Sequence, residues 1–66
     1  MKLMINGRER AFDGPQTVST VLEAEGQGER RVAVEVNREI VPRSRHATHA
    51  LRDGDCVEII HAIGGG

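Results

Sequence analysis

The chain has 66 residues, of which 38% are hydrophobic, so it can form one small core but not two. Nine basic and ten acidic residues give a formal net charge of −1, which leaves no broad basic field for binding nucleic acid. Phe12 is the single aromatic residue and Cys56 the single cysteine, which disfavours base stacking and excludes an internal disulfide. We expect a cytoplasmic domain with an aliphatic core, no membrane segment and no direct nucleic-acid partner.

The first predicted elements form a β-hairpin. Residues 2–6 fit the two-residue period of a strand, with Leu3 and Ile5 on one face, and Asn6-Gly7 is a strong signal for a two-residue turn. A second strand is expected over residues 8–13, with Phe12 as its core anchor. It should end at Gly14-Pro15, because proline has no N–H to donate to a ladder.

A short helix is predicted over residues 18–25. Thr17 is a suitable N-cap, and Gly26 suits the left-handed position that follows a helix. One apolar stripe at i, i+3 and i+4 spacing consists of Val18, Val21 and Leu22. Two helical turns are marginal in isolation, so we expect this stripe to pack on a sheet.

The second half of the chain predicts further strands. The alternation of residues 32–36 favours a half-buried strand. A turn at Asn37-Arg38 should connect it to a short strand over residues 39–41. Pro42 should end that strand. The polar segment 43–50 is expected to be a loop with a helical turn.

The last predicted strand covers residues 56–62 and follows the turn Asp53-Gly54-Asp55. Its alternation places Ile60 on the face opposite the core, where a polar residue would be expected. An apolar side chain in such a place favours contact with another protein. We therefore expect Ile60, Ala62 and Ile63 to form a partner-binding surface.

The order of these elements predicts an α+β fold. One mixed sheet of four to five strands should carry one main helix on one face. We expect residues 1–63 to form this domain and residues 64–66 to form a flexible glycine tail.

The three glycines at the end of the sequence are the candidate functional group. Glycine has no Cβ, so such a tail can thread a narrow channel and bring its carbonyl carbon against a phosphate. A carboxylate reacts only when one oxygen becomes a good leaving group, and a mixed anhydride with AMP, formed in another protein's ATP site, provides one. We expect the Gly66 carboxylate to be the modified group, presented by Gly64 and Gly65. A frayed end without function is the alternative.

Three stretches of the chain resemble the ThiS family of ubiquitin-like sulfur carriers. They are Gln16-Thr17-Val18, residues 36–43, and Asp53-Gly54-Asp55 leading through the last strand to Gly65-Gly66. The resemblance implies a β-grasp fold and a carrier protein that is not itself an enzyme and binds no permanent cofactor. It also implies a cycle in thiamine biosynthesis. A ThiF-like E1 adenylyltransferase uses ATP-Mg to adenylate Gly66, a cysteine desulfurase or other persulfide donor supplies sulfur for a thiocarboxylate, and thiazole synthase (ThiG) receives that sulfur.

The remaining reactive side chains are expected to be structural. Cys56 is predicted to be a small buried or half-buried thiol rather than a sulfur relay. The histidines lack the spacing of a zinc site, so we expect no metal; they are His46, His49 and His61. Most arginines should lie on a solvated face, although Arg43 and Arg45 are candidates for contact with an acidic partner.

Two other functional classes use the same sequence features. A ubiquitin-like modifier would join Gly66 to lysines through stable isopeptide bonds, and a β-grasp interaction module would not need its tail. Accumulation of covalent adducts favours the first, and full function without Gly65-Gly66 favours the second.

Overall fold

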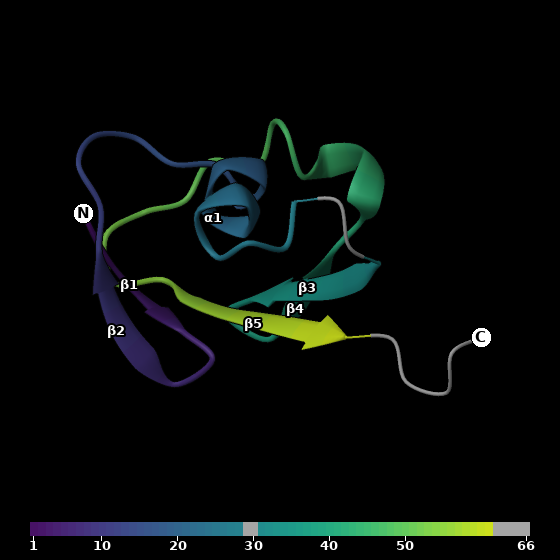
Figure 1. Cartoon of the computed structure of the whole chain (residues 1–66), viewed down its shortest axis with the longest axis horizontal. Helices are drawn as coiled ribbons and strands as arrows, with labels where there is room; N and C mark the ends of the chain where they lie inside the picture. Colours follow the sequence, from purple (N-terminus) through teal and green to yellow (C-terminus); the bar gives the residue numbers. More distant parts are fainter. Residues whose placement is uncertain (29–30, 62–66) are drawn as a thin grey trace.

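The computed structural model describes residues 1–28 and 31–61. One helix lies over one face of a five-stranded sheet (Figure 1). The elements in chain order are β1 (Lys2–Ile5), β2 (Arg8–Ala11), α1 (Val18–Ala24), β3 (Val32–Val36), β4 (Glu39–Val41), the 3-10 helix η1 (Arg43–Arg45) and β5 (Cys56–His61). This arrangement is a β-grasp, and it confirms the α+β class and the predicted order of elements.

The strands are arranged in the order β2-β1-β5-β3-β4. The first and last strands, β1 and β5, lie side by side and run parallel, with Met4 opposite Cys56. The other neighbouring strands in the sheet run antiparallel. The strand that leads toward the C-terminal residues is therefore the central strand, supported on both sides.

The core lies between the sheet and α1. Its buried members are aliphatic, as predicted: Leu3, Ile5, Val18, Val21, Leu22, Val34, Val36, Val41, Leu51, Val57 and Ile59. The alternating strand residues supply one side of this core and the apolar stripe of the helix supplies the other. Because α1 covers only this face, no helix of the described residues lies on the opposite face of the sheet (Figure 1).

The ends of α1 follow the predicted capping. The Thr17 hydroxyl accepts a hydrogen bond from the Thr20 N–H at 3.3 Å, and the Thr20 hydroxyl accepts one from the Thr17 N–H at 2.8 Å. This reciprocal pair is a capping box with threonine in the place usually taken by Glu or Gln. At the other end, Gly26 has a φ of +75° and stops the helix as expected.

The second strand is shorter than predicted. β2 ends at Ala11, opposite Lys2, which is the first residue of β1. Phe12 therefore lies outside the strand, although its N–H still donates to the Met1 carbonyl at 2.8 Å. Its half-buried ring packs against the core, and the Arg10 guanidinium carbon lies 5.7 Å from the ring centroid. Phe12 thus covers the rim of the core.

His46 is buried, although the sequence predicts it in a polar loop. Its side chain is 7% exposed, and Nε2 lies 3.1 Å from the Val41 carbonyl oxygen. The His46 carbonyl in turn accepts a hydrogen bond from the Ser19 N–H at 2.9 Å. His46 therefore joins the end of β4 to the first turn of α1, which is a structural role.

Candidate functional site

The candidate site is the end of β5, from which the chain continues to its final glycines. Of the residues predicted to act there, the structure describes Ile60, whose side chain is 45% exposed and faces away from the core as predicted. Ala62, Ile63 and the tail glycines Gly64, Gly65 and Gly66 lie outside the described residues. The geometry of the site is therefore that of β5 and its neighbours.

Asn6 supports β5 beyond the point where β1 has ended. The Asn6 N–H donates to the Val57 carbonyl at 2.9 Å, and the Asn6 Oδ1 accepts from the Ile59 N–H at 2.7 Å. The side chain of Asn6 thus replaces the carbonyl that another strand residue would have offered. Asn6 has a φ of 49°, a left-handed conformation that asparagine tolerates better than most residues. This contact fixes β5 two residues before its last residue, His61.

Replacement of Asn6 by alanine is expected to lower the free energy of unfolding by about 2 kcal/mol, because the Ile59 N–H loses its acceptor and a non-glycine residue remains at positive φ. Asn6→Gly loses the same acceptor but relieves the backbone strain, and Asn6→Asp keeps a carboxylate acceptor, so both should be less destabilised than Asn6→Ala. Urea denaturation of the three variants measures these differences. Equal stability of Asn6→Ala and the wild type would contradict the role given to this side chain.

A second asparagine fixes the beginning of β5. The Asn37 Oδ1 accepts from the Cys56 N–H at 2.9 Å, and its Nδ2 donates to the Asp55 Oδ1 at 2.9 Å. Asp55 also accepts from the Arg52 N–H at 2.8 Å, which closes the turn before the strand. Asn37 and Arg38 both have positive φ, so the predicted turn between β3 and β4 is confirmed. β5 is therefore held by an asparagine side chain near each end.

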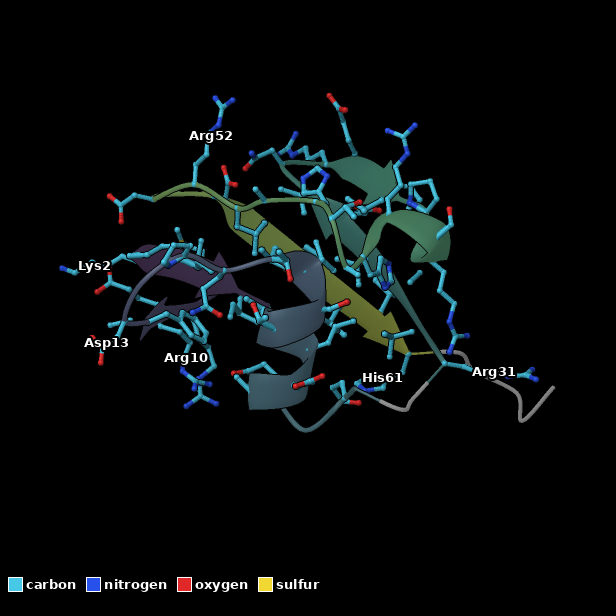
Figure 2. All side chains as sticks on the ribbon, turned by 90° about the horizontal axis from the view of Figure 1, so that it is seen from above. Lys2, Arg10, Asp13, Arg31, Arg52 and His61 are labelled. Atoms are coloured by element: carbon cyan, nitrogen blue, oxygen red, sulfur yellow. The ribbon has the colours of Figure 1, made fainter. Side chains whose placement is uncertain are left out.

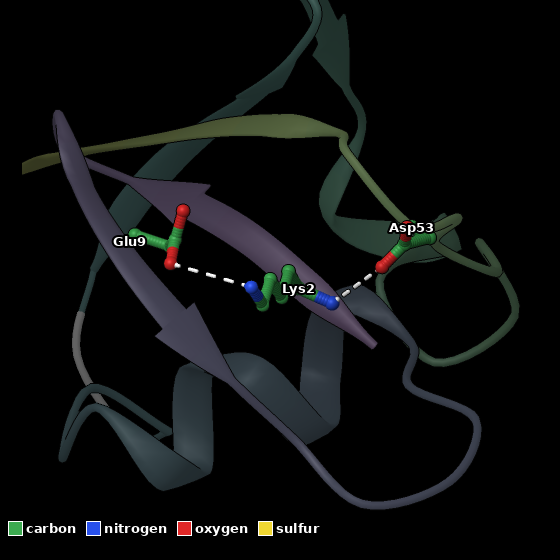
Figure 3. Close-up of polar contacts among 3 residues, drawn as sticks. All are labelled: Lys2, Glu9 and Asp53. Atoms are coloured by element: carbon green, nitrogen blue, oxygen red, sulfur yellow. Dashed lines mark hydrogen bonds and ion pairs between the residues drawn. The ribbon is translucent and has the colours of Figure 1, made fainter.

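Asp53 joins the turn before β5 to the beginning of β1, as Figure 3 shows. Its Oδ1 accepts a hydrogen bond from the Lys2 N–H at 2.6 Å, and the Gly54 N–H donates to the Lys2 carbonyl at 2.7 Å. The Lys2 ammonium group also lies 3.9 Å from a carboxylate oxygen of Glu9. Both of these side chains are exposed, so this ion pair adds little stability beside the turn contacts.

The sheet face without a helix combines apolar and acidic side chains. Ile40, 61% exposed, and Ile60 are the large exposed hydrophobic residues of the described part of the chain. Glu35 lies opposite Ile40 on one side and Glu58 on the other, whereas Ile60 lies opposite Ala33. Cys56 is exposed on the same face, so the prediction of a buried or half-buried thiol is wrong. The cause is the alternation of β5, which gives the core position to Val57.

A groove of about 500 Å³ opens beside the end of β5. It is lined by Arg31, Val32, Ala33, Arg43, Ile60 and His61. The His61 Nε2 lies 2.9 Å from the Gln27 Oε1, so that ring is tied to the segment after α1. Figure 2 shows Arg31 and His61 at the same end of the molecule, with Lys2, Arg10 and Asp13 toward the opposite end.

Neither a metal cluster nor a spanning helix occurs in the part of the chain that the structure describes. Within residues 1–28 and 31–61, no three side chains of His, Cys, Asp or Glu come together as metal ligands would. The same residues contain no helix with the length and apolar character needed to cross a bilayer.

A profile of the ThiS family matches residues 3–66. The chain belongs to the ThiS family. It is 33% identical over 66 residues to the sulfur carrier protein ThiS of Escherichia coli (strain K12), covering all of both chains. It is also 53% identical over 66 residues to the thiazole synthase of Paramagnetospirillum magneticum, but spans only 20% of that protein's length. The crystal structure of ThiS from Geobacter metallireducens superposes with a TM-score of 0.85 at 33% identity, with all of both chains covered.

Proposed function

We propose that this chain is a sulfur carrier for thiazole formation in thiamine biosynthesis, with the carboxylate of Gly66 as its working group. The observation that carries this proposal is the ThiS-family match over residues 3–66. The full-length match to a relative named as a sulfur carrier supports the same role. The fold supports it as well, because the central strand β5 leads directly to residues 62–66 and is held by side chains of two turns.

The proposed chemistry begins with a ThiF-like E1 adenylyltransferase. A Gly66 oxygen attacks the α-phosphorus of ATP, pyrophosphate leaves, and an acyl adenylate forms at the tail. A persulfide sulfur then displaces AMP, and reduction of the resulting acyl disulfide by a thiol leaves a thiocarboxylate. Glycine suits this position because the acyl carbon must approach both a phosphate and a sulfur without a side chain in the way. ATP-Mg belongs to the adenylyltransferase, and the carrier holds no permanent cofactor in this proposal.

Thiazole synthase is the proposed sulfur acceptor. The P. magneticum relative that bears this name contains a stretch matching all of our chain, within a much longer polypeptide. In that relative, a domain similar to this chain is part of the polypeptide named thiazole synthase. This linkage supports contact between the carrier and the synthase. A cysteine desulfurase or another persulfide donor completes the set of partners, and we place the cycle in the cytoplasm.

We further propose that Ile60, Ala62 and Ile63 bind the partner enzymes. The support comes from Ile60, which lies on the sheet face without a helix and one residue before the end of β5. An exposed isoleucine in this place is removed from water when the tail enters a partner, which favours the complex.

Intact-mass spectrometry after incubation with ATP-Mg, the host E1-like enzyme, a cysteine desulfurase, cysteine and a thiol reductant tests the proposed function. We expect a mass gain equal to the replacement of one oxygen by one sulfur, mapped to Gly66 and absent without ATP. An unchanged mass in the presence of an E1-like enzyme that is active on another carrier would contradict the proposal. Stable isopeptide adducts to lysines in cell extracts would instead identify a protein modifier.

A further inference from the structure

The groove beside the end of β5 combines basic side chains with apolar ones. Arg31, Arg43 and His61 supply its nitrogen-bearing side chains, and none of its lining residues within 1–28 and 31–61 is Asp or Glu. The apolar part of the lining consists of Val32, Ala33 and Ile60. The chain as a whole has a net charge of −1, so this concentration of positive charge is local.

The two groove arginines take no part in an ion pair within residues 1–28 and 31–61. The ion pairs found there are Lys2–Glu9 and Arg10–Glu25, both away from the groove. An arginine guanidinium binds a carboxylate through two parallel hydrogen bonds, which gives geometric selectivity as well as attraction. Arg31 and Arg43 are exposed and therefore accessible to carboxylates of another molecule.

The reach of the tail separates this groove from the reacting atoms. Residues 62–66 follow His61, and a fully extended segment of five residues spans about 17 Å. When the tail is extended in a partner's channel, Gly66 reacts at about that distance from His61. The groove then faces the outer rim of the channel, so its arginines meet protein side chains rather than the nucleotide or the sulfur.

The P. magneticum relative indicates which partner supplies that rim. In this relative, a stretch matching our whole chain belongs to a polypeptide named thiazole synthase. Two linked units meet at a high effective concentration, so a modest, electrostatically guided contact is sufficient for docking. A basic groove with an apolar base fits a surface segment that places Asp or Glu beside an apolar side chain.

We propose that the groove formed by Arg31, Arg43, His61 and Ile60 docks an acidic segment of the thiazole synthase that takes sulfur from Gly66. This inference rests on the proposed function and assigns the carrier surface used in its last step. The electrostatic part of the contact is made by the two arginines, and Ile60 supplies the apolar part.

Charge reversal tests this docking surface. We expect the double variant Arg31→Glu/Arg43→Glu to raise the Kd for the host thiazole synthase at least about tenfold, measured by isothermal titration calorimetry with both proteins purified. Arg52→Glu is the control for a single charge reversal, because Arg52 is also exposed but lies well away from Arg31 (Figure 2), and it should change Kd less than about twofold. The wild-type Kd should rise with salt, and the double variant should lose most of this dependence.

Several outcomes overturn the inference. They are absence of wild-type binding, an unchanged Kd in the double variant, or an equal effect of Arg52→Glu. A higher KM for the E1-like enzyme with an unchanged Kd for the synthase would assign the groove to the activating enzyme instead. Thiolation is measured separately. If the wild type binds the synthase but is not thiolated, the proposed function is overturned. If the protein is thiolated but its Kd is unchanged by substitution of both arginines, only the docking surface is overturned.

Discussion

A chain shortened by Gly65 and Gly66 is expected to lose sulfur transfer entirely while unfolding at the same temperature as the full chain. The loss follows from removal of the carboxylate that the proposed adenylation requires at the end of a glycine tail. Stability should not change, because the buried core that the structure describes extends from Leu3 to Ile59 and the β5 ladder ends at His61. Intact mass after thiolation and a thermal melt followed by circular dichroism measure the two properties.

Gly64→Ala is the matched control for this truncation. It keeps the final Gly65-Gly66 and the tail length, and adds only one Cβ, so thiolation should slow without being abolished. Gly66→Ala keeps a carboxylate but places a Cβ beside the reacting carbonyl, so it should be slower than Gly64→Ala. Undiminished thiazole formation with the truncated chain would show that the tail has no function and would favour an interaction module.

Local turn and cap chemistry allowed most element boundaries to be predicted. Asn6-Gly7 and Asn37-Arg38 form turns with positive φ where the sequence indicates them. Thr17 begins the helix because its hydroxyl accepts a hydrogen bond from a free N–H of the first turn. Gly26 follows the end of the helix because it adopts the positive φ needed there. Such signals act over a few residues, so they can be recognised without knowledge of the sheet.

The errors concern residues whose surroundings depend on strand pairing. The end of β2 was placed too late because it depends on where β1 begins, which residues 8–13 do not encode. Cys56 was predicted to be buried or half-buried from the usual behaviour of cysteine, yet the alternation that buries Val57 exposes it. The sequence predicts His46 in a polar loop, whereas its burial depends on contacts with β4 and α1.

In the candidate site, too, features set by one strand could be predicted from the sequence and features set by strand pairing could not. Gly66 remains a prediction, because it and the other tail glycines lie outside the described residues. Ile60 was placed correctly because the alternation of one strand determines its face. The groove was not predicted, because Arg31, Arg43 and His61 become neighbours only when β3 pairs with both β4 and β5. The sequence pointed to Arg43, but it contained no signal that would unite Arg43 with Arg31.

Leu3→Ala is expected to remove a large part of the stability of the fold. Leu3 is 1% exposed on the core face of β1, the strand that pairs with both β2 and β5. A buried leucine truncated to alanine costs about 2–5 kcal/mol, through lost burial and the cavity that remains. A domain of this length has a total stability of about 3–10 kcal/mol, so the variant should be partly or largely unfolded at 37 °C. Urea denaturation followed by far-UV circular dichroism measures the loss, since the chain has no Trp or Tyr for fluorescence.

Met4→Ala is the matched control, because Met4 is the next residue of the same strand but is only half-buried and points to the sheet face without a helix. It should cost about 1 kcal/mol or less, since no enclosed cavity results. Equal losses of stability in the two variants would mean that Met4 is as enclosed as Leu3. That result would contradict a core on only one face of the sheet. Thiolation of Leu3→Ala should recover when the folded fraction is restored by lower temperature, because the substitution alters the amount of folded carrier and leaves Gly66 unchanged.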